Sequence, residues 1–343
     1  MLKGKFRIIM LVAFVLVTGL LLTGCPAEEE TAVEQEPTFP TGNIIWAISR
    51  DPGDGQDITA RLLAPYLAQE LGVNVAVDNK PGAGGRVGFS ELFRQNPDGY
   101  YLGQDVLGQM ANFHVLGELD HPLEEIEWFS IIFKSPAALW VGADSEIKTI
   151  QDLIDLDRPV LIGETSLGGT HVPWTIGLFN ALGIEFDYVT GFGGRPEIAT
   201  AAMRLEIDAV SSSVSGYAAQ AEAGDLRALL IMGEERHPLL PDTPTLGEVA
   251  AELGNPDIEK FLPMGMAIYM VGAPPGTPRE VTKVFEDAFQ RIIEENEEFK
   301  AKAAEAKVDT VFMGYDETRA MLAEVIAILE DMDIKSIIEG LEQ

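Results

Sequence analysis

Cysteine and histidine are scarce in this chain. Cys25 is the single cysteine among 343 residues, so an internal disulfide is excluded. The four histidines, at positions 114, 121, 171 and 237, are too scattered for a spaced metal motif, and no second cysteine is available to complete one. The sequence therefore predicts neither a disulfide framework nor a metal site.

Positive charge is also scarce. The chain has 24 Lys and Arg against 55 Asp and Glu, which gives a net charge of −31. Such a field repels phosphate backbones, so nucleic acid is excluded as a partner. The same field opposes any anionic ligand, which must then be held by local positive dipoles.

Long apolar runs are missing except near the N-terminus. Three basic residues precede an apolar run from 8 to 22, which leads into LLTGC at Cys25. This is the layout of a secretory signal, and the run is short for a membrane span. The ending resembles a bacterial lipoprotein box, which implies a signal peptide at 1–24 and a lipidated Cys25. The alternative is an uncleaved anchor helix, and either one places the remaining chain outside the cytoplasm.

Large apolar residues are few in the segment that follows. Residues 25–42 are acidic and contain several prolines, so they cannot bury enough surface to order themselves. We interpret them as a flexible tether that holds the protein at the cell membrane, to which Cys25 is anchored.

Strand and helix patterns alternate through the rest of the chain. NIIWAIS (43–49) and VNVAVDN (73–79) have the composition of buried strands, and an amphipathic pattern with Pro65 inside it lies between them. The same alternation continues to about 273, and two long helices are predicted at about 278–306 and 316–334. The pattern predicts an α/β fold built from parallel βαβ units.

Two glycine-rich loops follow the first two strands. They are PGDGQD (52–57) and PGAGG (81–85), at the sheet edge where α/β proteins bind ligands. Glycine lets main-chain N–H groups approach an anion, and a following helix N-terminus adds positive charge. The candidate ligand-binding residues here are Gly53, Asp54, Gly55, Gln56, Asp57, Gly82, Ala83, Gly84 and Gly85. The alternative is that the glycines serve only tight turns.

A nucleotide interpretation of the second loop is weaker. GAGGRVG contains a G-x-G and a later glycine, but it follows the second strand and Pro81 interrupts the turn. A nicotinamide cofactor is also not expected outside the cell. We therefore predict no cofactor.

These segments together resemble one family. The chain resembles the extracytoplasmic receptors of tripartite tricarboxylate transporters, the Bug proteins, which have similar segments in the same order. In this chain the segments are PGDGQDITARLLAPYLAQELGVNVAVDNKPGAGGRVG, NPDGYYL, AGDLRALLIMGEERHPLLPDTPTLGE and GAPPGTP. The resemblance implies a two-lobed, type II periplasmic-binding-protein fold, with a mainly parallel sheet flanked by helices in each lobe. It places lobe one at 43–139 plus 233–343 and lobe two at 140–232, with crossovers near ALWVGAD and LRALLIM.

The resemblance also implies a second set of ligand-binding residues, on lobe two. ETSLGGTHVP (164–173) and the segment around 192 take the places of the family's binding loops, and serines 211–213 end a strand at the same sheet edge. The candidate residues are Ser166, Gly168, Gly169, Thr170, His171, Phe192, Gly193, Arg195, Ser211 and Ser213. Ser211 and Ser213 are chosen because alternate residues of a strand point the same way. His171 is either a ligand contact or a cap for the following helix.

The sequence departs from the family pattern at two charged positions. Asp54 stands where the family usually has glycine. Either its side chain points to solvent, or it faces the ligand and repels a second carboxylate. In the latter case the ligand carries an amine or a hydroxyl at that position. The usual Tyr and Lys near 191 are missing, and Arg195 either replaces that positive charge or lies on the surface.

Catalytic motifs are missing as well. A Ser-His-Asp enzyme would need one of serines 211–213 in contact with His171, and SVSGY lacks the leading glycine of a nucleophile elbow. We predict that the chain is not an enzyme. The resemblance implies a monomeric, lipid-anchored receptor that captures a small carboxylate and delivers it to a membrane permease. The alternative is a carboxylate sensor that acts through a signalling kinase ectodomain.

Overall fold

The computed structural model describes residues 39–341. The predicted signal peptide, Cys25 with its expected lipidation, and the predicted tether up to residue 38 lie outside the described residues. Within 39–341, no helix combines the length and apolar character that a bilayer crossing requires.

The expected βαβ units form the start of lobe one. Strands β1 (Ile44–Ile48), β2 (Val75–Asn79) and β3 (Tyr101–Val106) pair in parallel in the order β2-β1-β3. Helix α2 (Gly55–Leu71) connects the first two strands, and it runs through Pro65 to a left-handed cap at Gly72. The short helix η1 (Ala83–Gly85) and helix α3 (Arg86–Phe93) connect the next two, and α4 (Leu107–Leu116) follows β3.

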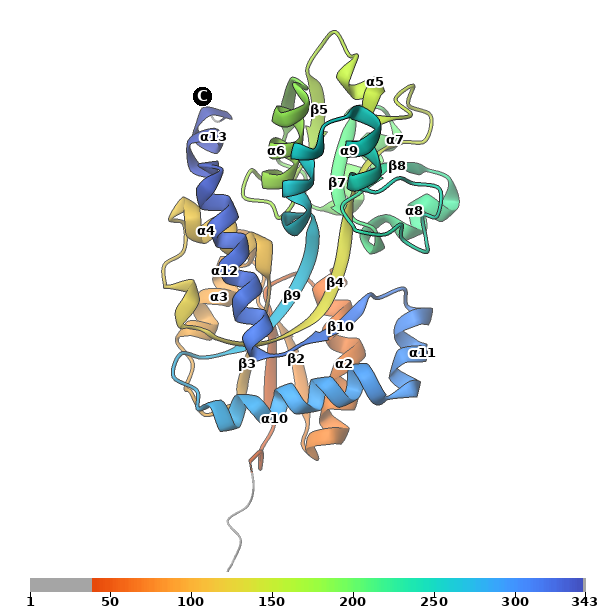
Figure 1. Ribbon diagram of the computed structural model, residues 1–343. Coiled ribbons are helices and arrows are strands. Elements are labelled where there is room, and N and C mark those ends of the chain that lie inside the picture. Colours follow the sequence, from red (N-terminus) through yellow and green to blue (C-terminus); the bar gives the residue numbers. More distant parts are fainter. Residues whose placement is uncertain (1–38, 342–343) are drawn as a thin grey trace, which may run out of the picture. The chain divides into compact units, whose positions relative to one another are not determined.

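Two long strands join the lobes. After the short helix η2 (Leu123–Glu125), strand β4 (Glu127–Gly142) pairs antiparallel with β9 (Met266–Ala273) as far as Pro136. From Ala137 onward β4 pairs antiparallel with β7 (Ala209–Ser213) and β8 (Leu226–Ile231) of lobe two. Figure 1 shows β4 and β9 running side by side between the two parts of the sheet. Each lobe therefore has a mixed sheet, in which parallel pairs adjoin the antiparallel strands that cross between the lobes.

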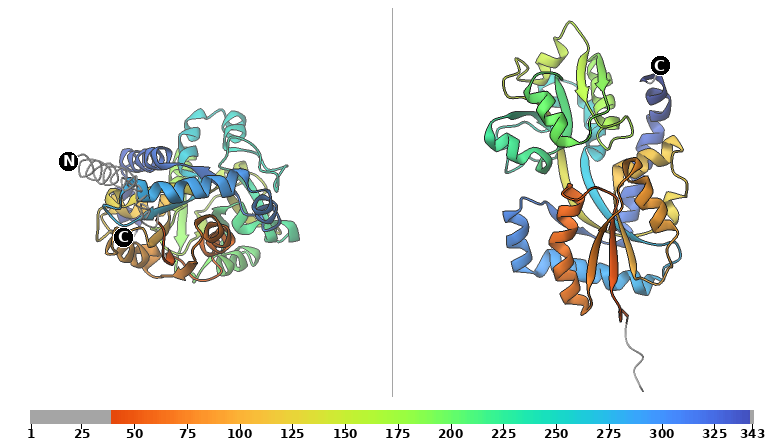
Figure 2. Two further views of the ribbon diagram at one scale, coloured as in Figure 1. Left: turned by 90° about the horizontal axis from the view of Figure 1, so that it is seen from below. Right: turned by 180° about the vertical axis from the view of Figure 1, so that it is seen from behind.

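Lobe two repeats the parallel arrangement. Strand β5 (Val160–Gly163) pairs in parallel with β6 (Phe186–Val189) and β7. Thr149 caps the N-terminus of α5 (Ile150–Ile154), in a reciprocal pair of bonds with Asp152. The other helices of this part are α6 (Val172–Leu182), α7 (Arg195–Met203), the short η3 (Ser215–Tyr217) and α8 (Ala218–Ala223). The view from behind in Figure 2 shows the orange and brown strands of lobe one below the green elements of lobe two.

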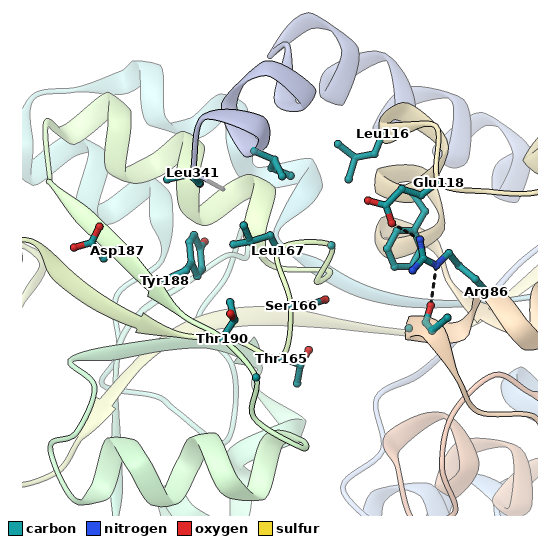
Figure 3. A pocket seen from close by; sticks show the side chains of 16 residues that line it. Arg86, Leu116, Glu118, Thr165, Ser166, Leu167, Asp187, Tyr188, Thr190 and Leu341 are labelled. Carbon is teal, nitrogen blue, oxygen red and sulfur yellow. Dashed lines mark hydrogen bonds and ion pairs between the residues drawn. The ribbon is translucent and has the colours of Figure 1, made fainter. Parts of the chain in front are cut away.

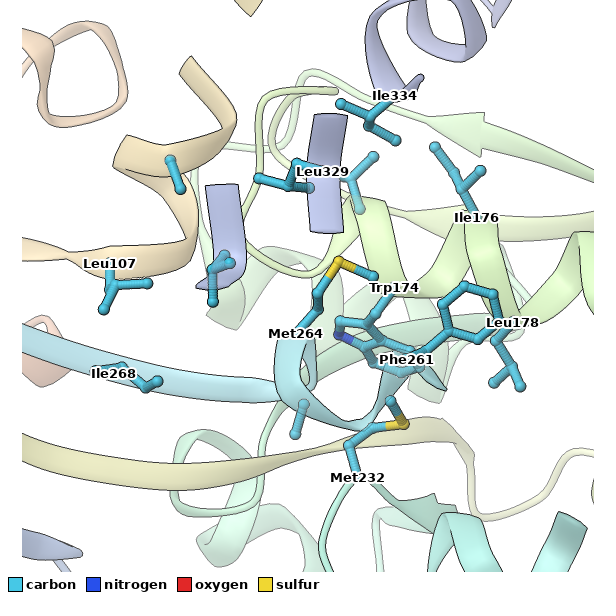
Figure 4. Packing of buried hydrophobic residues seen from close by; sticks show 14 of the residues in the cluster. Leu107, Trp174, Ile176, Leu178, Met232, Phe261, Met264, Ile268, Leu329 and Ile334 are labelled. Carbon is cyan, nitrogen blue, oxygen red and sulfur yellow. The ribbon is translucent and has the colours of Figure 1, made fainter. Parts of the chain in front are cut away.

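Residues 246–264 differ from the expected division of the chain. Helices α9 (Leu246–Leu253) and η4 (Pro256–Met264) pack on each other, and η4 packs on α6 of lobe two. Phe261 and Met264 join Trp174 in the buried cluster of Figure 4. Strand β8 pairs with β4 from Ala138 onward, in the same part of the sheet as β7.

The C-terminal region completes lobe one. The predicted helix at 278–306 is divided into α10 (Arg279–Gln290), the π-helical η5 (Arg291–Glu295) and α11 (Glu297–Glu305). The break occurs at Asn296, whose side chain accepts a hydrogen bond from the Phe299 amide and so starts a new helix. Strand β10 (Thr310–Met313) pairs with β4, and helices α12 (Tyr315–Asp331) and α13 (Ile334–Leu341) follow. The aromatic side chains of Trp46, Phe285 and Phe289 fill the core between the sheet and α10.

Candidate functional site

A cavity of about 370 Å³ is lined by residues of both lobes. This volume lies within the usual range for small-molecule sites. Lobe one contributes residues from the ends of β1 and β3 and from β9, and lobe two contributes residues from the loops after β5 and β6 and from β7. The cavity is therefore at the carboxyl edge of the parallel strands, as the sequence predicts for a ligand site.

More than half of the predicted site residues line this cavity. They are Asp54, Gly84, Ser166, Gly169, Thr170, His171, Phe192, Gly193, Arg195 and Ser211. Ala83 and Gly168 line a second, more open hollow of about 870 Å³, which shares Gly84, Thr165 and Ser166 with the first. Figure 3 shows this hollow between the Arg86–Glu118 ion pair on lobe one and Leu167 and Tyr188 on lobe two. Gly53, Gly55, Gln56, Asp57, Gly82, Gly85 and Ser213 line neither space.

In the first glycine loop, main-chain amides donate hydrogen bonds to acidic side chains of the same loop. The Gly53 amide donates to Asp57 Oδ2 at 2.9 Å, and the Gln56 amide donates to Asp54 Oδ1 at 3.1 Å. Burial opposes the charge of Asp57, but hydrogen bonds from Arg61, Gly53 and Asn79 outweigh it and lower the pKa of this carboxyl. Two amides that we expected to face a ligand are therefore already satisfied within the loop.

The backbone conformation of the second loop explains why most of its positions are glycine. Gly82, Gly84 and Gly85 have φ values of +132°, +68° and +106°, which other residues rarely adopt. The Gly85 amide donates to the Gly82 carbonyl, so it is part of the turn. Gly84 lines the cavity, and a Cβ atom there would lie 3.2 Å from Gln109 Nε2. The turn and the ligand-facing roles are thus divided among the glycines.

Arg195 and Asp54 both face the cavity and pair across it. Arg195 Nη2 lies 3.1 Å from Asp54 Oδ2, which joins the start of α7 in lobe two to the first loop of lobe one. The Arg195 carbonyl accepts a hydrogen bond from Tyr217 Oη at 3.1 Å, which fixes the start of the helix. Burial opposes the charge of Arg195, but the nearby Asp54 carboxylate outweighs it, so the pKa of Arg195 is raised and the group stays cationic.

His171 occupies the N-cap position of α6 without capping it. Its side chain makes no capping bond, and its Nδ1 accepts a hydrogen bond from Trp174 Nε1 at 3.3 Å. Burial, with a further contribution from Arg195, lowers the pKa of His171 to about 3. The imidazole is therefore neutral at physiological pH, and it lines the cavity as a polar, uncharged group.

The serine triplet of β7 is used differently from the prediction. Ser211 and Ser212 line the cavity, and Ser213 does not, because its Oγ accepts a hydrogen bond from the Gly216 amide at 3.2 Å. Ser211 Oγ lies 2.7 Å from Thr175 Oγ1. Ser212 is buried, and its Oγ has no partner within the described residues. Ser212 thus has a buried hydroxyl beside the cavity, without a protein partner among residues 39–341.

Sequence reasoning missed three charged residues and two tyrosines of the site. Arg50 and Asp51 come shortly after the end of β1, and Glu164 directly follows β5, so their position at the ligand-binding edge was a usable signal. Glu164 Oε1 accepts hydrogen bonds from the amide and hydroxyl of Thr165, and burial raises the pKa of this carboxyl. Tyr217 and Tyr269 also line the cavity, and nothing in their local sequence distinguishes them from core residues.

A two-lobed α/β fold with a polar cavity between the lobes is the architecture of the periplasmic binding proteins. The family model described as the tripartite tricarboxylate transporter family receptor, TctC, matches residues 59–337. The chain belongs to this family of extracytoplasmic solute receptors, so the resemblance seen in the sequence is confirmed. A UPF0065 protein in the tcbD-tcbE intergenic region of Pseudomonas sp. (strain P51) is 27% identical over 259 residues, 74% of this chain and 74% of that protein.

Solved structures agree on the fold. The structure of R. palustris Rpa4515 with adipate has a TM-score of 0.74 at 22% identity, and the match covers 87% of this chain and 98% of that one. The periplasmic binding protein BugD has a TM-score of 0.70 at 19% identity, over 85% of this chain and 98% of its own. Both likenesses show the predicted two-lobed fold.

Proposed function

We propose that this protein is a receptor that captures a small carboxylate in the interlobe cavity and delivers it to the membrane permease of a tripartite tricarboxylate-type transporter. The observation that carries the proposal is a cavity of about 370 Å³, lined by both lobes, in which the guanidinium of Arg50 has no carboxylate within 4.0 Å among residues 39–341. Family membership and the adipate bound by Rpa4515 support the same ligand class.

Capture uses the chain's own donors. The Arg50 guanidinium presents a planar fork that matches a carboxylate. The hydroxyls of Ser166 and Ser212 and the neutral His171 offer further hydrogen bonds from lobe two. Because donors come from both lobes, a bound carboxylate favours the closed arrangement over the open one. A closed receptor then presents to the permease a surface that the open one lacks.

The proposed binding set follows from the cavity lining. It comprises the ten predicted residues that line the cavity, with Arg50, Glu164, Ser212, Tyr217 and Tyr269 added. Ala83 and Gly168 belong to the adjoining hollow, through which we propose that the ligand enters. Gly53, Gly55, Gln56 and Asp57 support this site through the loop they form, since Gln104 Nε2 donates to the Gln56 carbonyl and Asp57 accepts from Arg61.

The remaining parts of the proposal concern organisation and anchoring. We propose lobe one as 43–136 plus 266–343 and lobe two as 137–265, because β4 changes partners between Pro136 and Ala137, β9 begins at Met266, and 246–264 pack on lobe two. A signal peptide at 1–24 and lipidation of Cys25 rest on the sequence pattern alone, and we propose that the protein acts as a monomer. Replacing Cys25 with serine should release the protein from the membrane fraction.

Ligand binding to the full chain tests the proposal. In a thermal-unfolding screen of mono- and dicarboxylates, a ligand at 100 times its Kd adds about 2.7 kcal/mol of apparent stability. Arg50→Gln should weaken each carboxylate hit at least tenfold, whereas Arg204→Gln, which removes an exposed arginine outside the cavity, should not change it. A panel in which no carboxylate binds, or an Arg50→Gln variant that binds as tightly as the wild type, would contradict the proposal.

A further inference from the structure

The charges around the cavity are unusual for a site that receives an anion. Two arginines and three acidic residues line it: Arg50, Arg195, Asp51, Asp54 and Glu164. Arg195 is already paired with Asp54 at 3.1 Å. Since those two neutralise each other, a ligand meets one unpaired guanidinium, that of Arg50, and the carboxylates of Asp51 and Glu164.

Arg50 and Glu164 lie on opposite lobes of the cavity. Arg50 follows β1 in lobe one, and Glu164 follows β5 in lobe two. Glu164 Oε1 is bonded to Thr165, and Oε2 has no hydrogen-bond partner among the described residues. One positive and one negative group are thus each available to a ligand, and they are supplied by different lobes.

A second carboxylate on the ligand has no available partner. It would meet Glu164 or Asp51, and like charges close together in a partly enclosed site repel strongly. Asp54 occupies only Nη2 of Arg195, so a second carboxylate could reach the other N–H groups of that guanidinium, but the positive charge it meets there is already offset by Asp54. A cationic nitrogen in the same place would instead pair with Glu164. The apolar side chains of Val106, Phe192 and Ile198 line the same cavity and suit a short hydrocarbon chain between the two charged ends.

We propose that the cavity selects its ligand by charge: it admits a molecule whose carboxylate binds Arg50 and whose cationic nitrogen binds Glu164, and it rejects dicarboxylates. This inference rests on the proposed function, which it narrows from carboxylates in general to zwitterions. Glu164 and Asp54 are the specificity-determining residues. Glu164 receives the nitrogen, and Asp54 offsets the positive charge that Arg195 would otherwise offer to a second carboxylate.

Titration calorimetry of the full chain with matched probes tests the selection. The two members of each pair have the same number of carbon atoms and differ only in one end group, a carboxylate or an amine. The pairs are succinate with 4-aminobutyrate, glutarate with 5-aminopentanoate, and adipate with 6-aminohexanoate. We expect the amino member to bind at least tenfold more tightly in every pair that binds. Glu164→Gln should reduce that preference at least fivefold. The control is Glu280→Gln on α10, which removes an exposed acid outside the cavity and should leave the preference unchanged.

The outcomes separate the selection from the receptor function. Dicarboxylates that bind as tightly as their amino partners, with binding still dependent on Arg50, overturn the selection and leave the receptor function standing. If neither the dicarboxylates nor the amino acids bind, the selection is overturned. If no member of the wider carboxylate panel binds either, the receptor function is overturned as well. As a second variant, Asp54→Asn frees Arg195 and should tighten dicarboxylate binding at least fivefold. An unchanged dicarboxylate affinity would remove Asp54 from the mechanism.

Discussion

Arg195 Nη2 lies 3.1 Å from Asp54 Oδ2, although 141 residues separate the two along the chain. Each residue has a second role, because Asp54 Oδ1 caps helix α2 through the Gln56 amide and Arg195 opens helix α7. The ion pair therefore joins two helix N-termini, one in each lobe. In the described protein it acts as a polar link across the cavity, in a place where a ligand carboxylate would otherwise find a guanidinium.

Separating the cap from the ion pair gives the first prediction. Asn caps a helix as well as Asp does, so Asp54→Asn removes the ion pair and keeps the cap, whereas Asp54→Ala removes both. We expect Asp54→Ala to lower the free energy of unfolding by about 1 kcal/mol more than Asp54→Asn does. Urea denaturation at neutral pH measures the difference.

A double-mutant cycle isolates the pair itself. Asp54→Asn, Arg195→Gln and the double variant should show a coupling energy of about 0.5–1 kcal/mol, because both side chains keep some exposure to solvent. The coupling should fall in 1 M salt, where charges are screened over about 3 Å. Strictly additive effects would mean that the two side chains do not interact in solution.

Tyr269 explains why position 55 is glycine. A Cβ atom on Gly55 would lie 2.5 Å from Tyr269 Oη, closer than unbonded atoms approach. Gly55→Ala should therefore displace the tyrosine and lower the free energy of unfolding by about 1–3 kcal/mol. Tyr269→Phe removes the clashing oxygen, so the double variant Gly55→Ala/Tyr269→Phe should recover most of the loss relative to Tyr269→Phe alone. A double variant as destabilised as the sum of the single variants would show that the contact is not the cause.

The fold was more predictable than the site, and particular residues show why. Strand runs such as NIIWAIS and VNVAVDN carry local signals, and the structure has β1 and β2 where these signals place them. Arg195 and Asp54 were both candidate site residues because of their charges, but the ion pair between them was beyond local reasoning, because it depends on how the two lobes come together. Tyr269 lies in an apolar strand and looks like any core tyrosine. Ser213 was placed in the site by strand alternation, and the turn at Gly216 captures its hydroxyl instead.

Two helical glycines offer a matched pair of substitutions. Gly177 lies in α6, where a Cβ atom would be 2.4 Å from the ring of Phe261 in η4. Gly340 lies in α13, and a Cβ atom there would meet nothing within 4 Å. Gly177→Ala should cost about 1–3 kcal/mol through overpacking, whereas Gly340→Ala should stabilise the protein by about 0.5–1 kcal/mol through helix propensity. Denaturant midpoints measure both changes, and a stabilising Gly177→Ala would show that α6 and η4 do not pack as described.

Asp105 makes stability depend on pH in a direction opposite to that of most carboxylates. It is 2% exposed at the end of β3, its Oδ1 has no partner within the described residues, and burial raises its pKa from 3.8 to about 7. A raised pKa means that the folded protein holds a proton that the unfolded chain releases, so the stabilisation is complete below about pH 4. It decreases as the pH rises and is lost above pH 7. Asp105→Asn, which cannot ionise, should therefore gain stability over the wild type as the pH rises from 5 to 8. Urea denaturation at both pH values measures this gain, with Asp98→Asn as an exposed control on the same lobe. An equal difference between Asp105→Asn and the wild type at pH 5 and pH 8 would show that Asp105 does not titrate in this range.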